Sequence, residues 1–365
     1  MDIIVSCEAL LKPLQAMSGV VEKKQVSPIL SHVLLNATDD YLMLTATDLE
    51  IEMLGFIKPN SVQKTGTIAV SARKLLDICR TLALDLPVCL SLENNQFALR
   101  SGDSCFILNT LPANDFPSLD DSQYTYQLQM PASDFKNLLT KTHFCMGLQD
   151  IRSYLNGVLL DFSERNLRAV AADGHRLALS SSDKITSNQE MNKFIIPRKT
   201  VSELIRLLGQ DEEVTLCFNE QRIKLMTENL IFTSKLINAQ YPNYNRLITR
   251  GTLEAIGDRE AIKQALTRTA ILSNEKFRGV RFHLDKNRLC LTANNADQEH
   301  AEEVVPLDYN HEPMEMAFNV AYLLDILSAI SSKTIRFLFS DVSNGVVIEP
   351  VDGDDSVYVV MPLRL

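Results

Sequence analysis

The chain has 365 residues, of which 45% are apolar and 22% charged, and its mean hydropathy is −0.02. This is enough apolar material for two or three domains, and no apolar stretch approaches the ~18 residues of a membrane span. The net charge of −10 excludes a uniformly basic nucleic-acid surface but allows a local one.

The start of the chain and its cysteines predict a cytoplasmic protein. Residues 1–8 lack the basic and apolar regions of a secretion signal. The seven cysteines stand singly in apolar runs without a CxxC pair, so we expect reduced core thiols, with neither a disulfide framework nor a zinc site.

The first third of the chain predicts two helices and several strands. Leu10 and Leu14 mark an apolar i, i+4 stripe, which is typical of a helix. Residues 33–48 alternate apolar side chains on both sides of a polar turn, which predicts strand, turn and strand. Residues 70–78 read as a short strand followed by a helix that begins near a serine.

The same order recurs in the second third of the chain. Phe135 and Leu139 form the apolar stripe, and residues 158–173 superimpose without gaps on 33–48 at an offset of 125. Residues 196–204 repeat the strand and helix, with a proline near the helix start.

A third copy follows at a further offset of 122, with the stripe at Ile262 and Leu266. Its strand–turn–strand segment is 280–295, and its strand–helix segment is 318–326. Polar, turn-rich stretches separate the copies. The sequence therefore predicts three similar α+β domains, at residues 1–122, 123–250 and 251–365.

Charge is unevenly divided among these domains, with net values of −6, +3 and −7. The pairs Arg73-Lys74 and Arg198-Lys199 stand at equivalent helix starts, which favours a shared basic surface over ordinary solvated helix faces. Acidic clusters at 299–303 and 352–355 are expected on outer edges and turns.

Motifs for catalysis are scarce. The sequence contains no GxxxxGK[ST], GxGxxG, HExxH or GxSxG pattern. Asp48, Glu50 and Glu52 alternate, which would place them on one face of a strand, where a solvated face is favoured over a metal-bound nuclease site.

The segment 173–176 (DGHR) is the most enzyme-like stretch, because an Asp–His pair can act as an oriented base. Its counterparts at 48–51 and 295–298 do not keep the pair, and no motif supplies a nucleophile. We therefore expect Gly174 to form a turn at a strand end, with His175, Arg176 and Leu177 at a surface crevice. A hydrolase with an Asp173/His175 crevice and a repeat-built scaffold without nucleic acid are the alternatives.

Long segments resemble the bacterial DNA polymerase sliding clamp family, the β subunit of the polymerase III holoenzyme, over essentially the whole chain. The matching segments are 10–14 (LLKPL), 47–50 (TDLE), 110–113 (TLPA), 154–157 (YLNG), 173–177 (DGHRL), 232–236 (FTSKL), 270–280 (AILSNEKFRGV), 292–295 (TANN) and 358–365 (YVVMPLRL).

This resemblance implies a non-catalytic processivity subunit: a head-to-tail homodimeric ring of six domains, with helices inside and sheets outside. Such a ring encloses duplex DNA without reading its sequence. The implied partners are a second copy, double-stranded DNA, the replicative polymerase catalytic subunit, an ATP-driven clamp loader, and other polymerases and repair proteins that carry short linear motifs. No membrane and no cofactor are implied.

The resemblance also implies three sets of site residues. DNA would be contacted by Lys24, Arg73, Gln149, Arg198 and Lys199. The dimer interface would hold Lys74, Phe106, Ile271, Leu272, Glu299, Glu302 and Glu303. One half of a partner-peptide pocket would be Leu155, Ala172, Gly174, His175, Arg176, Leu177, Pro242, Arg246 and Leu247. Its other half would be Arg152, Tyr154, Asn319, Tyr322, Ser343, Gly345, Val359, Met361, Pro362, Leu363 and Arg364.

Two departures from the family pattern, and two alternatives, bear on these sets. Ser104-Cys105 replaces a basic residue expected before Phe106, and Lys24 stands where an arginine is frequent, which loses the bidentate fork. Phe106, Ile271 and Leu272 could instead be internal core. The apolar C-terminal tail could merely complete the sheet of the third domain.

Overall fold

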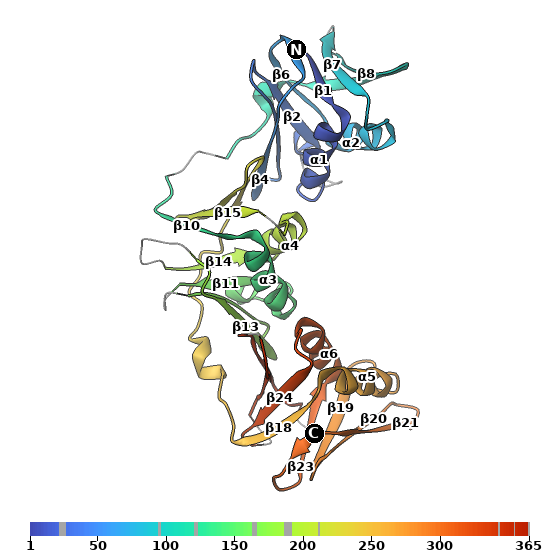
Figure 1. The fold of residues 1–365 in the computed structure, drawn as a ribbon, viewed down its shortest axis with the longest axis vertical. Coiled ribbons are helices and arrows are strands. Elements are labelled where there is room, and N and C mark those ends of the chain that lie inside the picture. The colour runs from blue at the N-terminus through green and yellow to red at the C-terminus, as the bar shows by residue number, and fades with distance from the viewer. Residues whose placement is uncertain are drawn as a thin grey trace. The chain divides into compact units, whose positions relative to one another are not determined.

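The computed structural model describes residues 1–21, 27–93, 96–119, 123–162, 166–185, 192–210, 212–341, 344–353 and 355–363. It is an α+β structure with a pair of longer helices for each third of the chain (Figure 1). The helices are α1 Cys7–Met17, α2 Ala72–Thr81, α3 Ala132–Thr142, α4 Arg198–Leu207, α5 Arg259–Ala270 and α6 Val320–Ala329. Short 3₁₀ turns are η1 Pro28–Ser31, η2 Ala113–Asp115, η3 His143–Cys145, η4 Ser153–Leu155 and η5 Tyr244–Leu247.

The predicted repeat is confirmed at the level of secondary structure. Each strand–turn–strand segment forms a hairpin, and each following strand leads into the second helix of its copy. Side-chain caps begin several helices: Ser6 accepts a hydrogen bond from the Ala9 amide at 3.4 Å, and Asp258 accepts one from the Ala261 amide at 2.8 Å.

Two compact units make up the described chain, and each is treated by itself. The first comprises residues 1–132 and 206–236, and the second comprises 133–185, 192–205 and 237–363. These units cut through the central third because its strand β17 (Leu230–Lys235) pairs antiparallel with β4 (Ile51–Ile57) of the first copy.

The first unit contains a thirteen-stranded sheet in the order β10-β15-β16-β17-β4-β3-β2-β6-β9-β8-β7-β1-β5. Its other strands are β1 Asp2–Ser6, β2 His32–Ala37, β3 Leu42–Thr47, β5 Ser61–Lys64, β6 Gly66–Ser71, β7 Pro87–Glu93, β8 Gln96–Ser101, β9 Ser104–Leu111, β10 Tyr126–Pro131, β15 Glu213–Phe218 and β16 Arg222–Met226. Helix α1 packs against α2 and β4. A Cβ at Gly55 would lie 2.7 Å from the Cβ of Pro13, so this approach of helix to strand requires glycine.

The second unit contains a nine-stranded sheet in the order β14-β11-β12-β13-β26-β25-β24-β18-β22. Its strands are β11 Gly157–Asp161, β12 Leu167–Ala172, β13 Arg176–Ser182, β14 Lys193–Pro197, β18 Leu253–Asp258, β22 Asp308–Tyr309, β24 Thr334–Phe339, β25 Val346–Pro350 and β26 Val357–Val360. A four-stranded sheet, β21-β20-β19-β23, packs against α5. Its strands are β19 Gly279–Asp285, β20 Arg288–Asn294, β21 His300–Pro306 and β23 Met314–Asn319.

Two expectations from the sequence are wrong, one about a cysteine and one about three acidic residues. Cys105 is exposed on β9 rather than buried in the core, although all seven cysteines are free. Asp48, Glu50 and Glu52 do not share a strand face: Asp48 lies in a turn, where it accepts the amides of Glu50 and Ile51, and Glu52 is 8% exposed and accepts the Leu119 amide at 2.9 Å. A turn and a linker contact therefore replace the solvated face.

No helix in the described ranges is long and apolar enough to cross a membrane. Those ranges also hold no group of three or more His, Cys, Asp and Glu side chains that could bind a metal ion.

Candidate functional site

The candidate site lies in the second unit, where a strand of the central copy meets a strand of the last copy. Strand β13 pairs antiparallel with β26, with Leu177 opposite Val359. Beyond β26, the Met361 amide donates to the His175 carbonyl at 2.9 Å, and the Leu363 amide donates to the Ala317 carbonyl at 2.7 Å. The chain beyond Val360 is therefore tied to two places at once and is more than an edge of the third copy's sheet.

Arg176 is the polar centre of this seam. Its guanidinium bonds Asp173 at 3.1 Å and Asp325 of α6 at 2.6 Å, and donates to the Phe144 carbonyl at 2.7 Å. It also lies over the ring of Tyr322, 4.4 Å from its centroid. Only 10% of its side chain is exposed, so one cation links the central and last copies in a largely dry setting.

An apolar floor lies beside this arginine. Leu155, Ala172, Leu177 and Val359 belong to one buried cluster, and Tyr154 packs partly buried against it. Burial raises the pKa of Tyr241, which packs against this cluster, and of Tyr322, whose ring lies beneath Arg176.

Two of the apolar side chains predicted for the pocket are open to solvent. Leu247 of η5 is 56% exposed and Met361 is 42% exposed. The His175 ring is exposed and stacks on Tyr322 with 6.2 Å between ring centroids. The site thus combines an apolar floor with exposed rings, a thioether and cations, a composition suited to an apolar anchor with a polar backbone.

Two glycines allow close approaches between segments at this seam. Gly174 has φ +89°, so it forms the predicted turn between β12 and β13, and a Cβ there would lie 3.0 Å from Arg152 Nη2. A Cβ at Gly345 would lie 2.7 Å from Val359 Cγ1 and 3.1 Å from the Met361 sulfur. Larger residues would therefore displace Arg152, Val359 or Met361.

Arg152 is held in place by its own loop. Its Nε and Nη2 donate to both carboxylate oxygens of Asp150, at 3.0 and 2.9 Å. These hydrogen bonds lower the pKa of Asp150 to about 2, so the pair stays ionised at any physiological pH.

The Asp–His base of the alternative enzyme hypothesis is not assembled. The Asp173 carboxylate accepts the backbone amides of His175 and Arg176 as well as the Arg176 guanidinium, while the His175 ring stacks on Tyr322. The carboxylate therefore orients a turn and an arginine rather than an imidazole.

The remaining residues predicted for the pocket differ in their exposure and contacts. Pro242 and Arg246 are exposed on the segment leading into and through η5. Asn319 caps α6 by accepting the Ala321 amide at 3.0 Å, and Pro362 is half-buried between the two tied residues of the tail. Ser343 and Arg364 lie outside the described residues.

The residues predicted to contact DNA occupy helix starts and one loop. Arg73 is exposed on α2, 3.7 Å from Asp77, and Lys199 is half-buried in α4. Gln149 is exposed with φ +54°, and Arg198 supports its loop by donating to the carbonyls of Met146 and Gly147 at 3.0 and 3.3 Å. Lys24 lies outside the described residues.

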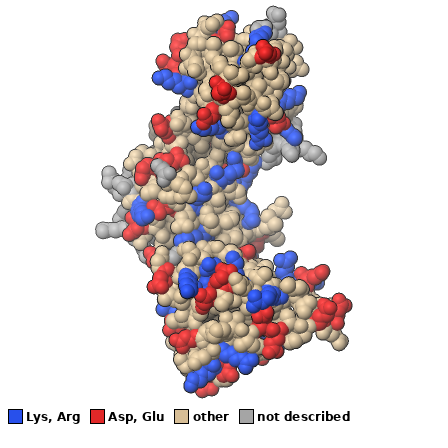
Figure 2. Space-filling view, turned by 45° about the vertical axis from the view of Figure 1, so that its right-hand side comes forward, with Lys and Arg blue, Asp and Glu red and all other residues tan. Residues whose placement is uncertain are grey.

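The residues predicted for the dimer lie on open surfaces of both units. Ile271 is 77% exposed, so the alternative that it is internal core is wrong. Leu272 and Phe106 are half-buried, and Lys74 is exposed on α2. Strand β21 is the edge of its sheet, and acidic side chains gather around its hairpin with β20 (Figure 2). Of the three predicted glutamates, Glu303 is already bridged by Arg268 at 2.6 Å, while Glu299 and Glu302 are exposed.

Four residues around the site were not among those assigned to the partner-peptide pocket, although Asp173 was named in the enzyme alternative. Phe144, Asp173 and Asp325 hold Arg176, and Tyr241 packs against Tyr154 with 5.8 Å between ring centroids. Tyr241-Pro242 repeats Phe116-Pro117 at the offset of 125, and this repeat was the one sequence pattern that could have pointed to Tyr241. Asp325 carried none, because its contact spans 149 residues of sequence.

We expect Arg176→Gln to lower the free energy of unfolding by about 2–3 kcal/mol, because it leaves the largely buried Asp173 without its cation and removes the link to α6. Urea unfolding would measure the loss. Arg73→Gln is the control, since its ion pair is solvent-exposed and worth at most about 0.5 kcal/mol. Equal stabilities of the two variants would show that the Arg176 network contributes nothing beyond a surface pair.

Comparisons with known proteins cover the whole chain. Three family models match in order: the N-terminal domain of the DNA polymerase III beta subunit at residues 1–120, its central domain at 129–243, and its C-terminal domain at 248–364. The chain is 44% identical, over 367 residues and 100% of both chains, to the beta sliding clamp of Pseudomonas aeruginosa.

Solved structures agree with these matches. The DNA polymerase III subunit beta of P. aeruginosa superimposes with a TM-score of 0.97 at 43% identity, covering 100% of both chains. A sliding clamp from the same organism, bound to griselimycin, superimposes with a TM-score of 0.96 at 43% identity over 100% of both chains.

Proposed function

The chain belongs to the family of the DNA polymerase III beta subunit, the sliding clamps, and from this premise we propose how its own residues hold a second copy, DNA and partner proteins. A sliding clamp is a processivity factor and not a catalyst. The domains proposed for this chain are residues 1–122, 123–250 and 251–365. The observation that carries the proposal is the threefold repeat, in which every copy presents a pair of helices beside a sheet.

Ring closure follows from the repeat. Two chains of three similar domains, joined head to tail, give six domains and a ring that closes, with helices toward the hole and sheets outside. The apolar surface at Ile271 and Leu272 of one chain would meet Phe106 of the other. Lys74 would pair with Glu299 or Glu302, since Glu303 already has a cation in its own chain.

Duplex DNA would pass through the hole without being read. Lys24, Arg73, Gln149 and Lys199 would contact phosphates, which carry no sequence information. Arg198 would instead hold the Gln149 loop in place, because its guanidinium donates to the carbonyls of Met146 and Gly147 in that loop. Enclosure rather than tight contact would supply the residence time.

We expect the double variant Arg73→Gln, Lys199→Gln to load onto DNA less well and to show a flatter dependence of log K on log salt, by about one unit of slope for each lost phosphate contact. Binding of the closed ring to circular duplex, measured over a range of salt, tests this. Lys58→Gln with Lys286→Gln is the matched control, because both lysines are exposed on turns between strands. An unchanged slope in the first pair would exclude these two residues from the DNA surface.

The cleft at the β13–β26 seam would receive the short linear motifs of the replicative polymerase, the ATP-driven clamp loader, and other polymerases and repair proteins. A Leu or Phe anchor would rest on the floor formed by Leu155, Leu177 and Val359, beside the adaptable Met361. Arg152, His175 and Arg246 would bind the peptide backbone or a carboxylate. The griselimycin-bound relative supports the view that clamps of this family take up ligands.

A further inference from the structure

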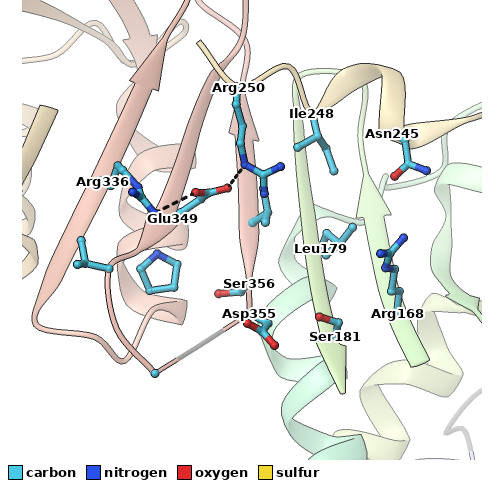
Figure 3. Close-up of a pocket in the computed structure, with 14 residues that line it drawn as sticks. Arg168, Leu179, Ser181, Asn245, Ile248, Arg250, Arg336, Glu349, Asp355 and Ser356 are labelled. Atoms are coloured by element: carbon cyan, nitrogen blue, oxygen red, sulfur yellow. Dashed lines mark hydrogen bonds and ion pairs between the residues drawn. The ribbon is translucent and has the colours of Figure 1, made fainter. Parts of the chain in front are cut away.

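A second hollow lies on the same seam, apart from the residues assigned to DNA, to the dimer and to the partner cleft. Its volume is about 820 Å³, within the range of ligand pockets. Strands β12 and β13 form one wall and β24 to β26 the other, and the linker that ends at Arg250 crosses above (Figure 3). We call this cavity the seam pocket. It is lined by Arg168, Leu179, Ser181, Asn245, Ile248, Arg250, Arg336, Glu349, Pro350, Val351, Gly353, Asp355, Ser356 and Val357.

The internal repeat supplies a comparison for this pocket. At the equivalent seam between β4 and β17, the hollow is about 410 Å³. Its lining includes Met43, Leu54 and the linker residues 116–119, with Glu52 and Lys224 as its charged members. The offset of 125 aligns Met43 with Arg168 and Leu54 with Leu179. The second seam has therefore kept an apolar floor but gained a guanidinium and about twice the volume.

Guanidinium groups dominate the polar lining. Arg250 Nε bonds Glu349 Oε1 at 2.7 Å, and Arg336 Nη2 lies 3.6 Å from Glu349 Oε2, so two cations share one carboxylate that is 10% exposed. Arg336 Nη1 also bonds Glu254 at 3.2 Å. Arg168 lies on the other wall of the pocket, on the side of Asn245 (Figure 3).

Donor capacity remains after these bonds are counted. The Arg250 side chain is 57% exposed, and its bond to Glu349 is made by Nε. Arg336 Nε is buried and has no hydrogen-bond partner among the described residues, which is costly for a charged donor. Three arginines against Glu349 and Asp355 leave the lining with a net positive charge.

We propose that the seam pocket binds a small organic anion that carries at least two carboxylate or phosphate groups. Planar guanidinium forks match such oxyanions in bidentate fashion, and arginine is preferred over lysine wherever that geometry matters. Arg168 and Arg250 would each take one oxyanion group. Leu179, Ile248 and Val357 would contact the carbon skeleton between the two groups.

The test is calorimetric titration of the full-length chain with citrate and, separately, with inorganic tripolyphosphate, so that the two arms distinguish carboxylate from phosphate. We expect saturable binding of at least one probe with a Kd below about 1 mM. Arg168→Met introduces methionine, the residue found at the aligned position 43 of the first seam. Arg250→Gln removes one cation, while Glu349 keeps its ion pair with Arg336. Each should weaken binding by about tenfold, and the double variant by about a hundredfold.

Two controls distinguish binding in the seam pocket from binding elsewhere on the chain. Arg80→Gln removes an exposed arginine of α2 and should leave the Kd unchanged. Deletion of residues 361–365 alters the partner cleft, and it too should leave anion binding intact, so a failure of the cleft proposal does not touch this one. Binding of neither probe, binding that survives the Arg168 and Arg250 variants, or binding lost with the tail deletion would each overturn the proposal. Melting temperatures would identify a variant that unfolds. If Arg168→Met unfolds, the Kd of the Arg250→Gln variant decides whether the anion binds in the seam pocket.

Discussion

We expect the double variant Ile271→Ala, Leu272→Ala to be a folded monomer at concentrations where the unaltered chain sediments as a dimer. Ile271 is 77% exposed, so its removal opens no cavity in the chain's own core. Each truncated side chain forfeits about 1.5 kcal/mol of burial at an interface. A head-to-tail dimer contains two such interfaces and hence four truncations, which adds to about 6 kcal/mol, or about 10⁴-fold in Kd.

Sedimentation velocity over a dilution series measures this dimer directly, with circular dichroism to confirm folding. Leu148→Ala is the matched control, because Leu148 is similarly exposed, at 75%, but lies on the Gln149 loop outside the predicted interface. A dimer with unaltered Kd in the double variant would remove these residues from the interface. If the double variant is unfolded, Leu272 belongs to the core of the chain and not to the interface.

The second large effect is expected at the partner cleft. Deleting residues 361–365 should weaken the binding of a polymerase-derived peptide by about a hundredfold or more, because the deletion removes the exposed Met361 and releases its bond to the His175 carbonyl. The dimer should persist, since none of its predicted residues belongs to the tail.

Fluorescence anisotropy with a labelled peptide gives the Kd, and sedimentation confirms the dimer. Leu84→Ala removes a comparably exposed apolar side chain from a turn of the first copy and should bind the peptide as the unaltered chain does. Undiminished binding after the tail deletion would rule out this cleft.

The helices, hairpins and threefold repeat could be read from the sequence because they depend on local patterns. Leu10 and Leu14 lie on the buried face of α1, and the segment 33–48 forms the hairpin of β2 and β3. The Gly174 turn was also predictable, because a left-handed backbone at a strand junction favours glycine.

What escaped prediction depends on contacts between distant segments. The pairing of β13 with β26 joins residues about 180 positions apart, and no local pattern specifies such a register. Glu52 looked like part of an exposed acidic stripe, but a linker amide 67 residues away makes it a buried acceptor. The seam pocket was missed for the same reason, since Arg168, Arg250 and Arg336 converge only in the fold.

The central claim is that this chain holds DNA by enclosing it. The most direct test loads the protein with an ATP-driven clamp loader onto a nicked circular duplex, and then compares retention during gel filtration before and after the circle is cut to a linear form. Topological enclosure predicts that the protein stays on the circle and slides off the linear duplex. Equal retention on both forms would show binding by contact alone and would contradict the account.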